Sequence, residues 1–248
     1  MNVKYTRADM MAVAMARLIA DRERVFVGVN SPLPMVAVTL ALKLHATHAD
    51  FITIAGGINA QPPALAAATS SARLSAGSAS VFDNEDFYGL NARGGVDVSF
   101  LGMAQIDAQA NVNSSFIGGQ TKPKVRFPGG GGAAVILPLT RRIILWRAAH
   151  SPRIFVERCE FVTSAGNIDR VVTPLCVFRK RDGRLALESI HPYVARDALQ
   201  QQTGFMIPGL DQAPLTPEPD ARELEMLVRI DPDSVRESEF RPADLAIA

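Results

Sequence analysis

The stretch RVFVGVNSPLPMVAVTLALKLHATHADFITI, residues 24–54, decides the fold class of this chain. Its first part, RVFVGVN, is typical of a buried strand, and PMVAVTLALKLHATH carries the apolar spacing of a helix. Pro32 and Pro34 suit the first turn of that helix, because proline lacks only an amide that would be unpaired there. ADFITI has the composition of a second buried strand. The stretch therefore predicts a strand–helix–strand unit.

Further short β-rich runs follow, separated by Gly, Asn and Pro. They read VDVSFLGMAQID, NVNSSFIG, RRIILW and RIFVERCEFVT. Strands of this kind alternating with helices predict an α/β fold, a layered mixed or parallel sheet with helices on its faces. The chain shows no internal repeat, and we expect a single domain over residues 1–248.

Three segments outside that unit have recognisable local signals. Thr6 and Asp9 cap an expected amphipathic first helix over the apolar run near residues 10–18. VFRKRDGRLALESI predicts a β-hairpin that turns at 182–183, since Asp-Gly favours a tight turn.

Near the end, PDARELEMLVRI predicts a helix whose apolar face includes Leu224, Leu227 and Val228. The Pro-rich segment 206–219 is the one linker-like stretch. We expect it to drape over the surface before this last helix.

The composition excludes several functional classes. The chain has 248 residues, is 48% hydrophobic and carries a formal net charge of +1, which argues against a nucleic-acid partner. Its apolar runs stay short of the ~20 residues of a membrane span, and charged residues interrupt the start too early for a signal peptide. Cys159 and Cys176 lie within apolar runs, so we expect reduced core thiols and a cytoplasmic protein.

Four consecutive glycines, Gly129, Gly130, Gly131 and Gly132, stand before a helical or turn segment. Exposed backbone amides at such a place can hold a phosphate or an oxyanion. The spacing fits neither known Gly-rich phosphate motif, and a plain tight turn is an equal alternative.

The histidines point to no metal site. His45 and His48 lie three residues apart near the expected helix end, without further ligands close by, so helix-end cations are the simpler interpretation. His191, before a proline, is either a loop contact or a catalytic base.

An acidic cluster occupies the segment VFDNEDFYGLNARGG. Asp83, Glu85 and Asp86 could act as general acids or bases, or bind a metal. The simpler interpretation is a solvated loop.

The order of these segments resembles the β subunit of class I CoA-transferases, from about residue 7 to the end. The most specific piece is GGVDVSFLGMAQIDAQANVN, residues 94–113, which is similar to the family signature except that Ala110 replaces a glycine. The resemblance implies an α-like partner subunit, an acyl-CoA substrate, no permanently bound cofactor and no metal.

In that family a glutamate in a turn attacks the thioester, and a glycine loop like 129–132 helps to form the oxyanion hole. The matching turn here follows the strand FITI and reads Ala55-Gly56-Gly57. Alanine can neither attack nor move a proton. The resemblance thus places Gly56 and Gly57 with the glycine loop among the oxyanion or CoA-binding residues, and leaves the nucleophile position empty.

Three functions remain open at this point. The first is an active heteromer that hydrolyses a CoA thioester or cleaves a carbon–carbon bond, as in the similar subunits that open steroid-derived rings and also lack this glutamate. The second is true CoA transfer with another carboxylate, Glu85 or Glu160. The third is a binding subunit without a catalytic role.

Overall fold

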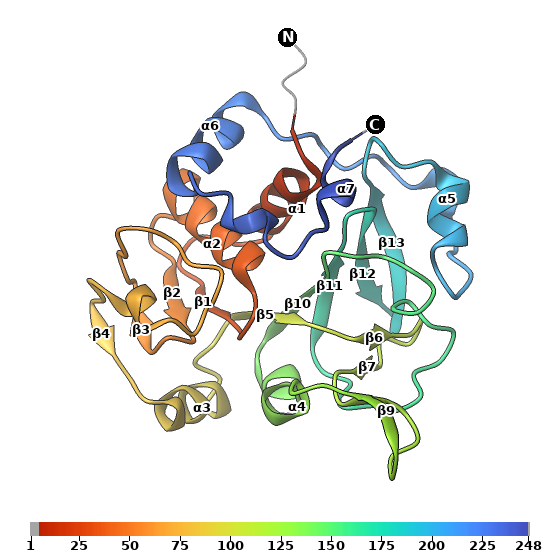
Figure 1. Ribbon diagram of the computed structural model, residues 1–248, viewed down its shortest axis with the longest axis horizontal. Coiled ribbons are helices and arrows are strands. Elements are labelled where there is room, and N and C mark those ends of the chain that lie inside the picture. Colours follow the sequence, from red (N-terminus) through yellow and green to blue (C-terminus); the bar gives the residue numbers. More distant parts are fainter. Residues whose placement is uncertain (1–4, 248) are drawn as a thin grey trace. The chain divides into compact units, whose positions relative to one another are not determined.

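The structure, a computed structural model, describes residues 5–247 and divides into two compact units (Figure 1). The first unit comprises residues 5–100 and 218–247 of the described chain, and the second comprises residues 101–217. A single domain over 1–248 stays a prediction, and its residues 1–4 and 248 lie outside the described part. None of the helices within residues 5–247 combines the length and the apolar character that a membrane crossing requires.

The first unit is a small sheet with helices packed on it. Its elements are α1 (Arg7–Ala16), β1 (Arg24–Val27), α2 (Pro32–Leu44), β2 (Asp50–Thr53), β3 (Gly57–Ile58), η1 (Ala72–Ser75), β4 (Ser80–Val81), α3 (Asn84–Ala92), the first three residues of β5 (Val98–Gly102), α6 (Ala221–Ile230), η3 (Val235–Glu237) and α7 (Pro242–Leu245).

The predicted strand–helix–strand unit is confirmed. β1 pairs in parallel with β2 on one side and with β5 on the other, so that Val25 lies opposite both Phe51 and Val98. β3 and β4 continue the sheet in antiparallel pairing. The parallel strands are almost completely buried, which explains their unbroken apolar sequences.

The first helix begins as predicted but is not amphipathic. The Thr6 hydroxyl accepts a hydrogen bond from the Asp9 amide at 3.1 Å, and the Asp9 carboxylate accepts one from the Thr6 amide at 2.7 Å. Residues 8–16 are all buried, because α2, α6, α7 and η3 all contact α1. Asp9 is buried as well and receives the Arg236 guanidinium at 2.6 Å, which ties the start of the chain to its end.

The second unit contains β6 (Gln105–Ile106), β7 (Val112–Asn113), β8 (Phe116–Gly118), β9 (Pro123–Arg126), α4 (Gly130–Leu139), β10 (Arg142–Trp146), β11 (Ile168–Val172), β12 (Cys176–Arg181), β13 (Arg184–Ile190), α5 (Arg196–Gln201) and η2 (Leu210–Gln212). β10 and β11 are parallel, while β11, β12 and β13 are antiparallel. β6 pairs with β7 and β8 pairs with β9. Both units thus combine mixed sheet pairing with helices, as the sequence predicts.

The predicted hairpin is confirmed at its turn. Arg181 pairs with Arg184, and the two residues between them, Asp182 and Gly183, have φ values of 49° and 76°. This left-handed pair is the geometry that Asp-Gly favours between two strands.

Two expectations for the second unit are corrected. The prediction of a β-rich run at 153–163 is wrong, since this segment forms only an isolated bridge of Phe155 with Ile106 and otherwise runs as loop. The Pro-rich segment 206–219 does more than drape over the surface: Leu215 forms a bridge with Ile190, and Ile207 is buried.

The late helix is confirmed as α6, but two details of it are wrong. The short helix α7 follows it, so α6 is not the last helix. Leu227 is fully buried whereas Val228 is 64% exposed, so the buried stripe is narrower than the sequence suggested. Arg17 contacts the start of α6 by donating its Nε to Glu223 at 2.8 Å.

Candidate active site

The turn that follows β2 has the form that the sequence predicts. The strand ends at Thr53, and residues 54–56 turn the chain back into β3, with Thr53 opposite Gly57. Gly56 has φ +88°, a conformation that residues with a side chain avoid. Ala55, the residue before Gly56 in this turn, is half-buried and presents only a methyl group.

The two glycines of this turn use their amides within the turn itself. The Gly56 amide donates to the Thr53 carbonyl at 3.0 Å, and the Gly57 amide donates to the Thr53 hydroxyl at 3.2 Å. A Cβ at Gly56 would lie 2.8 Å from the carbonyl oxygen of Phe82, whose amide in turn donates to the Gly56 carbonyl. These two glycine amides shape the turn, and neither is left over for an oxyanion in this conformation.

The glycine run forms the start of α4. Gly129 is the N-terminal cap residue, and Gly130, Gly131 and Gly132 make the first helical turn. Gly131 donates its amide to the Pro128 carbonyl at 3.2 Å. Within the described chain, the amides of Gly130 and Gly132 have no protein acceptor. The amide of the cap residue Gly129 has no acceptor in the described chain either, so the helix start offers three free donors, and Gly131 is not one of them.

Close packing explains why the run needs glycine at its first two positions. A Cβ on Gly129 would lie 2.7 Å from the Cβ and 3.0 Å from the carbonyl oxygen of Ser114. One on Gly130 would lie 2.9 Å from the Ser115 hydroxyl. Gly131 has open space around it. The helix start is thus pressed against the segment that follows β7.

The signature segment 94–113 includes β5, β6 and β7, and the loop that joins β6 to β7 wraps around one buried carboxylate. Asp107 accepts hydrogen bonds from the amides of Gln109 and Asn111 at 3.0 Å each, and from the Cys159 amide at 3.2 Å. The loop carries Ala110 through φ +62°. This explains the family preference for glycine at that position, from which this chain departs.

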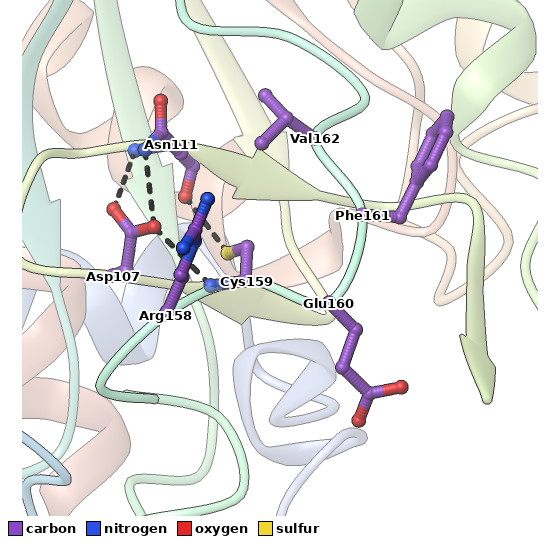
Figure 2. A pocket seen from close by; sticks show the side chains of 7 residues that line it. All are labelled: Asp107, Asn111, Arg158, Cys159, Glu160, Phe161 and Val162. Atoms are coloured by element: carbon purple, nitrogen blue, oxygen red, sulfur yellow. Dashed lines mark hydrogen bonds between the residues drawn. The ribbon is translucent and has the colours of Figure 1, made fainter. Parts of the chain in front are cut away.

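A cavity of about 510 Å³ opens beside this loop, lined by Asp107, Asn111, Arg158, Cys159, Glu160, Phe161 and Val162 (Figure 2). Burial raises the pKa of the Cys159 thiol to about 12, so it stays protonated, and it donates to the Asn111 carbonyl at 3.2 Å. Glu160 is exposed, points away from Asp107 and accepts the Gly118 amide at 2.8 Å. Of the two carboxylates suggested as alternative nucleophiles, Glu160 lines this cavity and Glu85 does not.

The acidic cluster is not a loop. Asp83 caps α3, and its reciprocal pairing with Asp86 forms a capping box. Glu85 lies exposed in the first turn of the helix. Negatively charged side chains stabilise the positive N-terminal end of a helix. This structural role accounts for all three carboxylates without catalysis.

The histidines singled out by the sequence are structural. His191 is fully buried, bonds the Thr216 hydroxyl at 3.0 Å and the Thr173 carbonyl at 2.9 Å, and burial lowers its pKa to about 4. His48 pairs with Asp21 on the surface, while His45 bonds the Ile19 carbonyl.

No signal in the sequence indicated the role of a fourth histidine. His150 stacks on Phe155 with a centroid distance of 3.9 Å and contacts the hydroxyls of Thr173 and Thr203. Burial lowers its pKa to about 3, so it is neutral. No group of three or more His, Cys, Asp or Glu side chains within residues 5–247 is arranged to hold a metal.

The fold and these loops have counterparts in known proteins. The pattern of the family described as Coenzyme A transferase matches residues 8–202. The chain is 31% identical over 243 residues to the B-type (β) subunit of 3-oxoadipate CoA-transferase from Pseudomonas knackmussii, covering 90% of this chain and 92% of the relative. This chain belongs to the coenzyme A transferase family. Within it, the chain is a β-type subunit, because it matches that relative over nearly its full length.

Other relatives in this family are named for different reactions. The cholesterol ring-cleaving hydrolase IpdB subunit of Mycobacterium tuberculosis is 28% identical over 258 residues, covering 95% of this chain and 99% of the relative. The solved structure of the decarboxylase AibA/AibB superposes with a TM-score of 0.88 at 27% identity, covering 95% of this chain and 98% of the other.

Proposed function

We propose that this chain is the β-type half of a two-chain enzyme that hydrolyses an acyl-CoA thioester or cleaves a carbon–carbon bond of its acyl group. The observation that carries this proposal is the methyl group of Ala55 in the turn after β2. A CoA transfer that passes through a glutamyl thioester needs a carboxylate there, as the family resemblance implies. Without it, the turn has no nucleophile to offer.

The free amides at the start of α4 also support this proposal. The free amides of Gly130 and Gly132 suit an oxyanion, because preorganised donors stabilise charge that develops on a thioester or enolate oxygen. Such stabilisation serves hydrolysis and carbon–carbon cleavage as well as transfer. The general base is then a residue of the α-type partner, since the buried histidines of this chain are neutral and their ring nitrogens are already hydrogen-bonded to threonines.

The names of two relatives support a reaction other than transfer. One is called a ring-cleaving hydrolase subunit and the other a decarboxylase, and both align with about 95% of this chain. We propose by analogy that the partner is an α-type subunit and that CoA enters as part of the substrate. Because both cysteines are free and buried, we also propose a reducing, cytoplasmic compartment.

A second candidate is true CoA transfer with Glu160 as nucleophile. Glu160 favours it because its exposed carboxylate lines the cavity of the second unit. Glu85, in the first turn of α3, is exposed and does not line this cavity.

The test is to trap the intermediate in the purified two-chain complex. Incubation with acyl-CoA followed by borohydride should leave peptide 51–62 unmodified, and the kinetics should not be ping-pong, because no glutamyl thioester can form at Ala55. The isolated chain should show no turnover. The Ala55→Glu variant tests the converse and should gain labelling in that peptide.

Ping-pong transfer with the label on Glu160 would replace the hydrolase or lyase proposal by the second candidate. A complex that forms but turns over no CoA thioester of a broad panel would leave only a binding role for this chain. Turnover by this chain alone would contradict the two-chain proposal.

A further inference from the structure

Helix α4 is apolar on every side, although only half of it is buried. Its sequence GGGAAVILPL, residues 130–139, contains no polar side chain. Ala133, Ile136 and Leu137 face the interior of the second unit. A helix that is apolar all round is normally covered all round, so the outer half of α4 needs a partner.

The outer half forms one continuous surface, which we call the bare face: Ala134, Val135, Pro138 and Leu139. All four residues are exposed, Val135 at 39% and Leu139 at 40%. Their spacing of one, four and five residues puts them on one side of the helix. Contiguous exposed apolar surface of this kind marks interaction sites.

The hairpin β8–β9 comes directly before α4 in the chain and is cationic. Only three residues, 127–129, separate the end of β9 from the start of α4. Lys122, Lys124 and Arg126 are exposed, and the side chains of these three residues form no ion pair or hydrogen bond within the described chain. Glu160, which accepts the Gly118 amide, is the carboxylate that contacts this hairpin. The second unit as a whole has 14 Lys and Arg against 8 Asp and Glu, a net charge of +6.

We propose that the bare face and this hairpin together form the docking surface for the α-type subunit. The inference rests on the proposed function. The matching surface of the α-type subunit has an apolar centre and carboxylates at the edge that meets the hairpin. A second copy of this chain fits less well, since a two-fold contact would bring two hairpins of like charge together. The free amides at the start of the same helix then lie beside the interface, where the partner can add the base.

The test is co-expression with the cognate α-type subunit and measurement of complex formation by sedimentation velocity. Val135→Glu and Leu139→Glu place a carboxylate on the bare face and should weaken the complex at least tenfold. Val228→Glu is the matched control, because Val228 is an exposed valine on α6 of the first unit. Thermal melting of each isolated variant verifies that it is folded.

The charge of the hairpin is tested separately. Lys124→Glu should slow association and reduce its dependence on salt, while Arg181→Glu, an exposed cation at another turn of the same unit, should not. Unchanged assembly of folded Val135→Glu and Leu139→Glu variants would overturn the inference. The inference would also be overturned if these variants lost self-association but still bound the α-type subunit. A complex that assembles as described but turns over no CoA thioester would contradict the proposed function and leave the docking surface standing.

Discussion

At the scale of single residues, Ala110 and Ala108 allow a direct comparison of backbone conformation, because both alanines lie in one loop. Both are buried, but only Ala110 has a left-handed backbone, at φ +62°. That conformation costs a non-glycine residue about 1–2 kcal/mol. The alanine at this departure from the family signature is therefore tolerated by the loop around Asp107, not favoured by it.

We predict that Ala108→Gly lowers the free energy of unfolding by about 1–2 kcal/mol, through the lost methyl group and the added chain entropy. Ala110→Gly has the same two losses but relieves the strain of the left-handed backbone. Its free energy of unfolding should therefore stay within about 1 kcal/mol of the parent. Urea titration of the two variants measures the difference. Equal destabilisation by both would mean that the loop imposes no strain on Ala110.

At the scale of elements, the start of α4 decides whether its amides can act. Gly129 cannot accept a Cβ without moving Ser114, whereas Gly131 has room for one and its amide is already bound to Pro128. The two substitutions therefore differ in whether they shift the free amides of Gly130 and Gly132.

We predict that Gly129→Ala lowers kcat of the complex by about 100-fold or more, since losing an oxyanion donor has an effect of about 10²–10³. Gly131→Ala should keep kcat, measured at saturating α-type subunit, and raise helix stability by about 0.5–1 kcal/mol. Steady-state kinetics with a CoA thioester and melting curves check both. A Gly129→Ala variant that melts at a lower temperature but keeps its rate per folded molecule would point to a plain structural turn.

At the scale of the whole molecule, the buried histidines couple the fold to pH. His150 and His191 share Thr173 as a partner and are neutral when folded, with pKa values lowered to about 3 and 4. The unfolded chain binds these protons near pH 6.5, so between about pH 6.5 and 4 it holds more protons than the folded chain. Stability is therefore expected to fall as the pH falls through this window.

We predict that each buried histidine contributes a loss of about 1.4 kcal/mol per pH unit below about pH 6. His150→Phe, which preserves stacking on Phe155, should lower the slope of unfolding free energy against pH by about one proton. His48→Gln, at an exposed site, is the control. Denaturant titrations between about pH 4.5 and 7.5 measure the slopes. An unchanged slope in His150→Phe would show that His150 does not titrate in unfolding.

The sequence by itself determined what depends on neighbouring residues. Apolar runs of the right length predicted β1, α2 and β2, Thr6 with Asp9 predicted the start of α1, and Asp182-Gly183 predicted the hairpin turn. It also carried the family signature, because loop residues around one carboxylate must follow each other at fixed spacing. The capping box of α3 was missed, because its carboxylates suggested a solvated loop.

The tertiary structure alone decided what depends on residues far apart in the chain. Which glycine amides are free follows from the Pro128 carbonyl and from packing against Ser114, and the neutral state of His150 follows from its burial. The sequence suggested an amphipathic α1, and it did not distinguish the complete burial of this helix from the bare face of α4, since both helices are rich in apolar residues. Whether an apolar helix face is covered depends on how distant segments pack, and no local pattern records that packing.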